Sequence, residues 1–247
     1  MVVLVKFIGI TGFEDSGKTD IVERLVKELK KRGFRVGTLK HVPQEDFTID
    51  QEGTDTWRHA EAGAEEVHLL SPDEKVTIEK SEFSLGNVLR KIEDLDYAIV
   101  EGFRDSEIIP KIAVADTERE AERLDDVFTI AFIKNGAGEK SVFGFEDTDT
   151  ILELVKDSAM RPVGDLDCGQ CGFDTCGEFV QAVANGDTPQ DGCIALDGKV
   201  TLKVDGKKVP LKPFVEDLID STISGLVSSL KEGEGDRIEL ELKEDGR

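Results

Sequence analysis

Several kinds of residue are scarce in this chain of 247 residues. It has one tryptophan, one tyrosine, two methionines and three histidines. It contains no apolar run of about 18 residues, so we expect no membrane-spanning helix. The apolar N-terminal segment lacks the basic residues and the small-residue cleavage site of a secretory signal peptide, and we therefore expect a cytoplasmic protein.

Positive charge is also in short supply. Lysine and arginine number 31 against 53 aspartates and glutamates, which gives a formal net charge of −22. Nucleic acids and anionic membranes repel such a surface, so we expect neither as a partner. The acidic residues are spread along the whole chain, which favours a solvated acidic surface over an acidic tail.

What is present points first to an α/β fold. Apolar residues at three-and-four spacing predict a helix over 20–31, between predicted strands at 2–10 and 35–39. Strand, helix, strand is a βαβ unit and indicates a parallel sheet. The patterns also predict strands at 66–70, 76–78, 97–100, 108–115 and 127–133, and helices at 57–62, 83–92 and 147–156.

A phosphate-binding loop connects the first strand to the first helix. The run from Gly12 to Thr19 matches the pattern G-x-x-x-x-G-K-[ST]. Glycines allow close approach of the backbone to phosphate, Lys18 can reach the β- and γ-phosphates, and the Thr19 hydroxyl can ligate Mg²⁺. We therefore predict nucleotide binding by Gly12, Asp15, Ser16, Gly17, Lys18, Thr19 and Asp20.

A phosphate-binding loop of this kind usually works with a second acid for Mg²⁺, on a neighbouring strand. Asp96 precedes the predicted strand 97–100 and Glu101 follows it. The loop lies at the exit of its own strand, so in a parallel sheet the exit residue is the nearer one. We therefore assign the catalytic and Mg²⁺-binding roles to Lys18 and Glu101, with Thr19 as the second ligand.

The segment 40–59 follows the second strand and is dense in functional residue types. Its candidates are His41, Asp55, Arg58 and His59. A single histidine is more often a hydrogen-bonded surface residue than a functional one. The density of basic, acidic and aromatic residues at the ligand-binding edge of the sheet nevertheless favours a binding function, with Arg58 suited to clamp an anion.

Several ordered motifs together resemble those of the MobB family, the GTP-binding adaptors of molybdopterin-guanine dinucleotide biosynthesis. The resemblance covers roughly residues 5–156. The motifs are the runs 12–19, 36–41, 55–59, 62–64, 100–104 and 110–112.

The resemblance implies a P-loop NTPase fold, GTP with Mg²⁺, slow hydrolysis and a homodimer. It also implies partnership with molybdopterin and with the guanylyltransferase that joins GMP to it, with His41, Asp55, Arg58 and His59 on the partner or pterin side. The chain departs from the family at Glu14, Asp15 and Asp20, acids that should weaken phosphate binding. No N-K-x-D motif for guanine is present, and Asn135 is either a base contact or a turn residue.

The four cysteines lie at 168, 171, 176 and 193, within 26 positions. Three thiolates in a tight loop and one remote thiolate suit a cubane cluster, whereas zinc ribbons favour two C-x2-C pairs. The segment also resembles the four-iron four-sulfur domain of corrinoid iron–sulfur proteins. We therefore predict a [4Fe–4S] cluster bound by Cys168, Cys171, Cys176 and Cys193, with zinc and disulfides as the alternatives.

The sequence thus predicts a P-loop domain at 1–157 and a small α+β iron–sulfur domain at 165–247. The second domain should contain a helix at 177–185, a hairpin at 200–211 turning at Asp205-Gly206, an amphipathic helix at 214–230 and a last strand at 238–242. The leading hypothesis is a GTP-binding adaptor of molybdenum cofactor biosynthesis. The alternatives are an electron-transfer protein whose cluster is gated by nucleotide, and a metal module with a structural role only.

Overall fold

The computed structural model describes residues 5–44, 47–80, 83–190, 192–193, 199–204, 207–209, 211–230 and 238–242. The chain divides into two compact units, Met1–Pro162 and Val163–Arg247, called here the N-terminal and C-terminal units. No helix within the described residues combines the length and the apolarity needed to cross a membrane.

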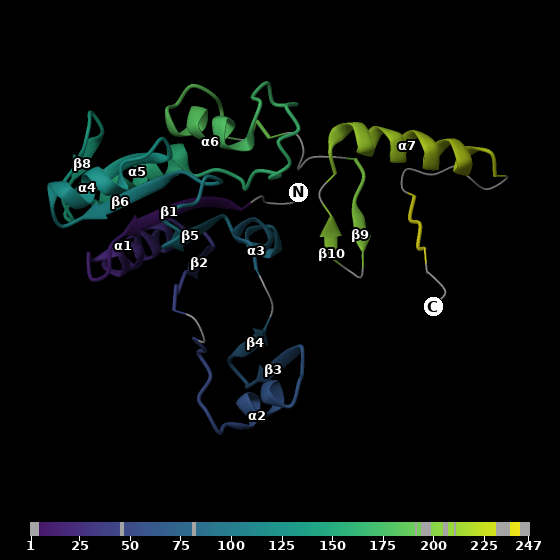
Figure 1. Cartoon of the computed structure of the whole chain (residues 1–247), viewed down its shortest axis with the longest axis horizontal. Helices are drawn as coiled ribbons and strands as arrows, with labels where there is room; N and C mark the ends of the chain where they lie inside the picture. The colour runs from purple at the N-terminus through teal and green to yellow at the C-terminus, as the bar shows by residue number, and fades with distance from the viewer. Residues whose placement is uncertain are drawn as a thin grey trace. The chain divides into compact units, whose positions relative to one another are not determined.

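The N-terminal unit is built on a six-stranded sheet with the order β2-β5-β1-β6-β7-β8. Every neighbouring pair in it is parallel, as the βαβ pattern predicts. Figure 1 shows the strands with helices around them. Its elements are β1 Lys6–Gly12, α1 Lys18–Lys31, β2 Val36–Lys40, α2 Asp55–Glu61, β3 Glu66–Leu70, β4 Lys75–Glu79, α3 Leu85–Lys91, β5 Tyr97–Glu101, β6 Lys111–Ala115, α4 Glu118–Leu124, β7 Thr129–Lys134, β8 Ser141–Phe143 and α5 Thr148–Ser158.

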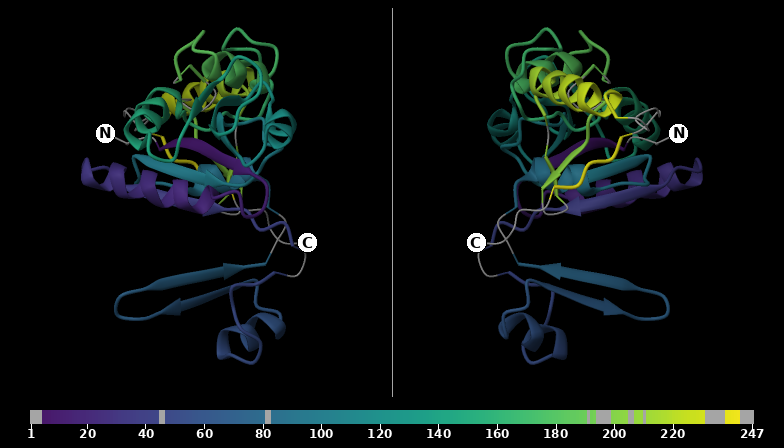
Figure 2. Two further views of the ribbon diagram at one scale, coloured as in Figure 1. Left: turned by 90° about the vertical axis from the view of Figure 1, so that its left-hand side faces the viewer. Right: turned by 90° about the vertical axis from the view of Figure 1, so that its right-hand side faces the viewer.

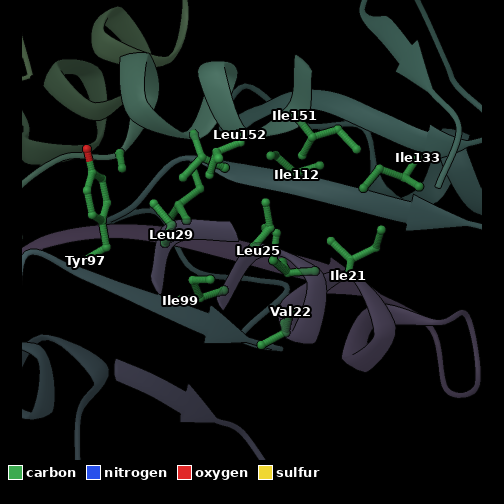
Figure 3. Packing of buried hydrophobic residues seen from close by; sticks show 14 of the residues in the cluster. Ile21, Val22, Leu25, Leu29, Tyr97, Ile99, Ile112, Ile133, Ile151 and Leu152 are labelled. Carbon is green, nitrogen blue, oxygen red and sulfur yellow. The ribbon is translucent and has the colours of Figure 1, made fainter. Parts of the chain in front are cut away.

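One face of the sheet is covered by α1 and α5. Alternate residues of the strands point to this face, and the apolar stripes of both helices meet them (Figure 3). Each fully buried Leu or Ile side chain contributes roughly 1.5–3 kcal/mol through removal from water. The side chains that Figure 3 labels in this core are Ile21, Val22, Leu25, Leu29, Tyr97, Ile99, Ile112, Ile133, Ile151 and Leu152.

The opposite face is covered by α3 and α4. Leu89 of α3 packs with Phe7, Ala98 and Val100. These strand residues alternate along the chain with those that face α1 and α5. Leu124 of α4 packs in a second cluster around the central strands. The sheet is therefore buried on both faces, which explains why β5 and β6 read as continuous apolar runs.

The segment between β2 and α3 forms a sheet of its own. β3 and β4 pair antiparallel, with Val67 opposite Ile78, and α2 packs on β3. The predicted strands at 66–70 and 76–78 are therefore confirmed, and they lie outside the parallel sheet. Alternation identified both strands correctly, but a connection of only four residues between them favours a hairpin over a crossover.

The C-terminal unit contains α6 Cys176–Ala184, β9 Leu202–Val204, β10 Lys207–Val209 and α7 Pro213–Ser228. β9 and β10 pair antiparallel, as the predicted hairpin requires. The predicted turn Asp205-Gly206 lies outside the described residues. The described residues 238–242 are not in a strand, so that prediction is wrong. Figure 2 shows α7 as the long helix in yellow.

Candidate functional site

The loop between β1 and α1 is shaped by its glycines. A Cβ on Gly12 would lie 2.5 Å from the carbonyl oxygen of Val114 and 2.6 Å from Ser16 Oγ, so no larger residue fits there. Gly17, the residue before α1, has φ of 90°, and Asp15 has φ of 55°. Asp15 and Gly17 thus flank Ser16 with left-handed backbone, a conformation that occurs in loops whose N–H groups bind anions.

Lys18 is the first residue of α1 and is half-buried. Its ammonium group donates a hydrogen bond to the carbonyl oxygen of Phe13, across the loop. Burial lowers the pKa of Lys18, and the negative charge of Glu101 partly opposes this effect. Glu14 and Asp15 also act on Lys18, so the two acids of the loop lie within electrostatic range of its ammonium group.

Glu101 and Thr19 meet at the carboxyl edge of the sheet. Thr19 Oγ1 donates a hydrogen bond of 3.0 Å to Glu101 Oε1. Glu101 ends β5, where it is in register with Ile10 of β1 and Lys40 of β2, and only 7% of it is exposed. A hydroxyl and a buried carboxylate side by side are the kind of oxygen ligands that Mg²⁺ uses beside a nucleotide.

Asp96, the alternative to Glu101 as a Mg²⁺ ligand, lies at the other end of β5. Its carboxylate accepts a hydrogen bond of 2.6 Å from the backbone N–H of Arg35. Asp96 therefore holds the start of β2, and strand direction was sufficient to separate the two acids.

His41 lies next to the Thr19–Glu101 pair. Its backbone N–H donates to the carbonyl oxygen of Glu101, and its ring stacks on Phe103 with centroids 4.3 Å apart. Gly102 makes this contact possible, because a Cβ there would lie 2.9 Å from the Cβ of His41. The stacked pair therefore joins the residues that follow β2 and β5.

The other three predicted residues of this segment, Asp55, Arg58 and His59, lie together on α2. Thr54 caps this helix by accepting from the N–H of Trp57, and Arg58 pairs with Asp55 at 3.7 Å. Among the described residues, none of these three side chains has a hydrogen bond or ion pair with the loop 12–19. The structure thus groups them with one another and separates them from Lys18 and Glu101.

Lys134 ends β7 and Asn135 follows it, and Lys134 connects this strand to the phosphate-binding loop. Lys134 donates to the carbonyl oxygen of Ser16 at 2.7 Å and pairs with Asp116. The side-chain amide of Asn135 donates to the carbonyl oxygens of Ala115 and Asp116, at 3.2 and 2.8 Å. Its amide donors are therefore engaged in holding the turn after β6, and a role in base contact would fall to its oxygen.

Sequence reasoning missed four basic residues around this site. Lys40 pairs with Glu101, and Lys134 supports the loop. The guanidinium groups of Arg104 and Arg123 lie 5.5 and 4.6 Å from the ring centroid of Phe13. Lys40 and Arg104 stood inside recognised motifs, and Lys134 stands at the end of a predicted strand. Arg123 lies in the last turn of α4, a helix that the sequence pattern did not predict, so no signal pointed to it.

A second site is formed by the cysteines. Cys168, Cys171, Cys176 and Cys193 line one small cavity. Its other walls include Val163, Leu166, Phe173 and Phe179, and the two phenylalanine rings pack edge to face with centroids 5.8 Å apart.

The loop before α6 carries three of the four cysteines up to the start of the helix. Asp165, Asp167, Gly169 and Gly172 all have positive φ, so the chain reverses direction repeatedly. Cys176 begins α6, and its N–H donates to Asp167 at 2.7 Å. Thr175 and Glu178 form a capping box there.

The four cysteine side chains lie around one cavity and do not meet at one point. Among the described residues, no set of three or more His, Cys, Asp or Glu side chains converges closely enough to hold one metal ion. The four thiols instead surround a shared cavity with apolar walls. Thiolates spaced around a cavity suit the iron atoms at the corners of a cubane, whereas zinc draws its four ligands onto one point.

The fold and the first site together define a class of protein. A parallel sheet with a glycine loop between its central strand and the following helix, and an acid at the end of the next strand, is the fold of P-loop nucleoside-triphosphate-binding proteins.

Within this class, the chain belongs to the family described as "Molybdopterin guanine dinucleotide synthesis protein B", or MobB, whose model matches residues 7–135. The chain is 32% identical over 231 residues to the "Putative molybdopterin-guanine dinucleotide biosynthesis adapter protein" of Methanocaldococcus jannaschii, covering 92% of each chain. It is 38% identical over 113 residues to the adapter protein of Haemophilus influenzae, covering 44% of this chain and 62% of that one.

Two further comparisons concern the fold and the cysteines. The crystal structure of Bacillus subtilis MobB superposes with a TM-score of 0.53 at 24% identity, covering 61% of this chain and 96% of that one. This likeness shows that the two chains share a fold. A second family model, described as "Putative Fe-S cluster", matches residues 165–195 and includes all four cysteines.

Proposed function

We propose that this protein is a GTP-binding adapter in the biosynthesis of molybdopterin-guanine dinucleotide. The observation that carries the proposal is the arrangement of Lys18, Thr19 and Glu101 around the loop 12–19, in a chain that belongs to the MobB family. The adapter proteins of Methanocaldococcus jannaschii and Haemophilus influenzae bear this function in their names.

The residues of the loop supply what a nucleoside triphosphate needs. The N–H groups at the start of α1 and the Lys18 ammonium group bind phosphate oxygens, and Thr19 and Glu101 hold Mg²⁺. Mg²⁺ supplies charge neutralisation between the phosphates. Glu14 and Asp15 weaken phosphate binding, because both carboxylates lie within electrostatic range of Lys18 and offset its positive charge. We therefore expect weak binding and slow hydrolysis rather than rapid turnover.

The same proposal names partners and an assembly state. A guanylyltransferase transfers GMP to molybdopterin, and the adapter positions nucleotide for that step. His41, at the nucleotide edge, and Asp55, Arg58 and His59, on α2, are the residues that we propose for contact with the enzyme or the pterin. We further propose that the protein acts as a homodimer.

For the C-terminal unit we propose a [4Fe–4S] cluster bound by the four cysteines. The apolar cavity that they share supports a cluster over zinc. Metal analysis and visible absorption after anaerobic purification test this directly. About four irons and four sulfides per chain support the cluster, and one zinc per chain contradicts it.

The proposed function is tested by reconstituted synthesis of molybdopterin-guanine dinucleotide. A guanylyltransferase is given limiting GTP, Mg²⁺ and molybdopterin, with or without this protein. We expect added wild-type protein to raise product formation, and Lys18→Ala to abolish the increase. Lys27→Ala is the matched control, since Lys27 lies on α1 but is exposed and, within the described part of the chain, pairs only with Glu23. No increase with the wild-type protein contradicts the proposal.

A further inference from the structure

Lys40 is a basic residue at the nucleotide site to which the P-loop motif gives no role. It ends β2, directly beside Glu101 at the end of β5. Its ammonium group lies 3.0 Å from Glu101 Oε1, the same carboxylate oxygen that accepts the Thr19 hydroxyl. Two donors therefore converge on one oxygen of the carboxylate proposed to hold Mg²⁺.

The two partners of this ion pair differ in freedom. The side chain of Glu101 is 9% exposed and fixed between two strands, whereas that of Lys40 is 61% exposed. A lysine carries its charge on a flexible four-carbon stem and can change partners without moving the backbone. The carboxylate is thus the fixed half of the pair and the ammonium group the movable half.

The charges around the loop favour the terminal phosphate as a partner for Lys40. Lys40 lies close enough to Lys18 for the two ammonium groups to repel, which helps to lower the pKa of Lys18 after the larger effect of burial. Glu14 and Asp15 add negative charge at the same place. A third phosphate brings more negative charge to this edge of the sheet. A second mobile cation beside Lys18 would therefore stabilise the bound triphosphate.

Mg²⁺ and Lys40 would compete for Glu101, because both draw on the negative charge of the same carboxylate. A divalent ion held by Thr19 and Glu101 would take over that charge and release the Lys40 ammonium group for another partner, within range of Lys18. The oxygens nearest to that position belong to the phosphate that shares the metal, because P-loop proteins place Mg²⁺ between the β- and γ-phosphates.

We propose that Lys40 is the residue by which this site distinguishes a nucleoside triphosphate from a diphosphate. It neutralises Glu101 in the absence of Mg²⁺, and it pairs with the terminal phosphate once Mg²⁺ takes Glu101. The inference rests on the proposed nucleotide site and adds to it a residue that determines specificity. His41 follows Lys40 directly, so the exchange occurs where the chain leaves β2.

The test measures the dissociation constants of GTP and GDP by calorimetry, with Mg²⁺ and with EDTA, for wild-type protein and Lys40→Met. With Mg²⁺ we expect Lys40→Met to weaken GTP by about tenfold or more, and GDP by less than about twofold, since one charged hydrogen bond is lost only for GTP. With EDTA we expect both nucleotides to weaken equally, because Glu101 then faces the phosphates unneutralised.

Lys40→Arg and Lys31→Met complete the design. Arginine keeps the charge and should retain most of the preference for GTP, and Lys31 is an exposed residue of α1 that pairs with Glu28. Equal losses for GTP and GDP with Mg²⁺, or no loss for either, overturn the inference while leaving the nucleotide site intact. Wild-type protein that binds neither nucleotide overturns the proposed function and this inference together.

Discussion

The two units of this protein build their sites in different ways. In the N-terminal unit, Lys40 and Glu101 stand at the ends of paired strands, so the sheet fixes their backbone positions before any ligand binds. In the C-terminal unit, the cysteines stand on a loop with several left-handed residues and at the start of a short helix. The first site is held by the backbone, and the second depends far more on the group that its thiols bind.

The hydrophobic cores of the two units also differ, in the extent to which they bury apolar side chains. The N-terminal unit buries apolar residues on both faces of its sheet. In the C-terminal unit the buried apolar side chains are few, and α7 has none among its described residues, while Phe214, Leu218 and Leu226 are exposed. A small core is commonly supplemented by metal–ligand bonds, whose free energy then becomes folding free energy.

The largest expected effect is therefore loss of a cysteine. We predict that Cys171→Ser removes the cluster and unfolds α6, because the thiolates that surround the cavity hold the loop before that helix. Hydrogen exchange should show lost protection in residues 176–184 and unchanged protection in β1 and α1. Retained protection of α6 in a variant without iron would contradict the claim that the C-terminal unit depends on the group its thiols bind.

The matching change in the N-terminal unit is Leu152→Ala. Leu152 is fully buried between α5 and the sheet (Figure 3). We therefore expect the free energy of unfolding of this unit to fall by about 2–5 kcal/mol in the variant. Chemical denaturation followed by circular dichroism measures the change. The iron content should stay at the wild-type level, and a loss of iron would show that the two units are not energetically separate.

A smaller effect concerns pH. Burial puts the pKa of Lys18 below its ordinary value of 10.5, so its ammonium group loses the proton earlier than an exposed lysine does. Phosphate favours the charged form. GTP binding should therefore take up a proton in the pH window that begins at the lowered pKa of Lys18, and affinity should fall as the pH rises through it.

Calorimetry in two buffers of different ionisation enthalpy measures this proton uptake. Lys18→Arg keeps its charge throughout the window and should bind without uptake. Identical uptake in the wild type and in Lys18→Arg would assign the proton to another group.

The smallest expected effect is on the cluster. The two sites lie in separate compact units, so we predict that GTP with Mg²⁺ leaves the reduction potential of the cluster unchanged. Redox titration monitored by visible absorption, with and without nucleotide, checks this. A reproducible shift would favour the alternative hypothesis of an electron-transfer protein gated by nucleotide.

The sequence was informative wherever a periodic pattern coincided with a motif. It predicted the parallel sheet, the loop 12–19 and the choice of Glu101 over Asp96, because the direction of a parallel strand decides which end lies at the ligand edge. The cysteine spacing likewise predicted one shared site.

Other features left too little signal. The helix α4 was not predicted, since its seven residues carry mainly charge and bury only Ala121 and Leu124. β8 was missed because it has three residues, none of them buried. The alternation of Ile238, Leu240 and Leu242 predicted a strand wrongly, because alternation does not reveal whether a neighbouring strand supplies hydrogen bonds. Lys40 lay within the segment singled out as functional, but its pairing with Glu101 became visible only once the strand order placed β2 beside β5.

The central claim is that the N-terminal unit binds GTP with Mg²⁺ through Lys18, Thr19 and Glu101. The most direct measurement is a calorimetric titration of the full chain with GTP and with ATP in the presence of Mg²⁺, repeated with Lys18→Ala. We predict binding of GTP in preference to ATP, and a loss of at least about a hundredfold in the variant, since the half-buried ammonium group is the one that we propose to contact the phosphates. Tighter binding of ATP than GTP, or unchanged GTP affinity in Lys18→Ala, would contradict the account.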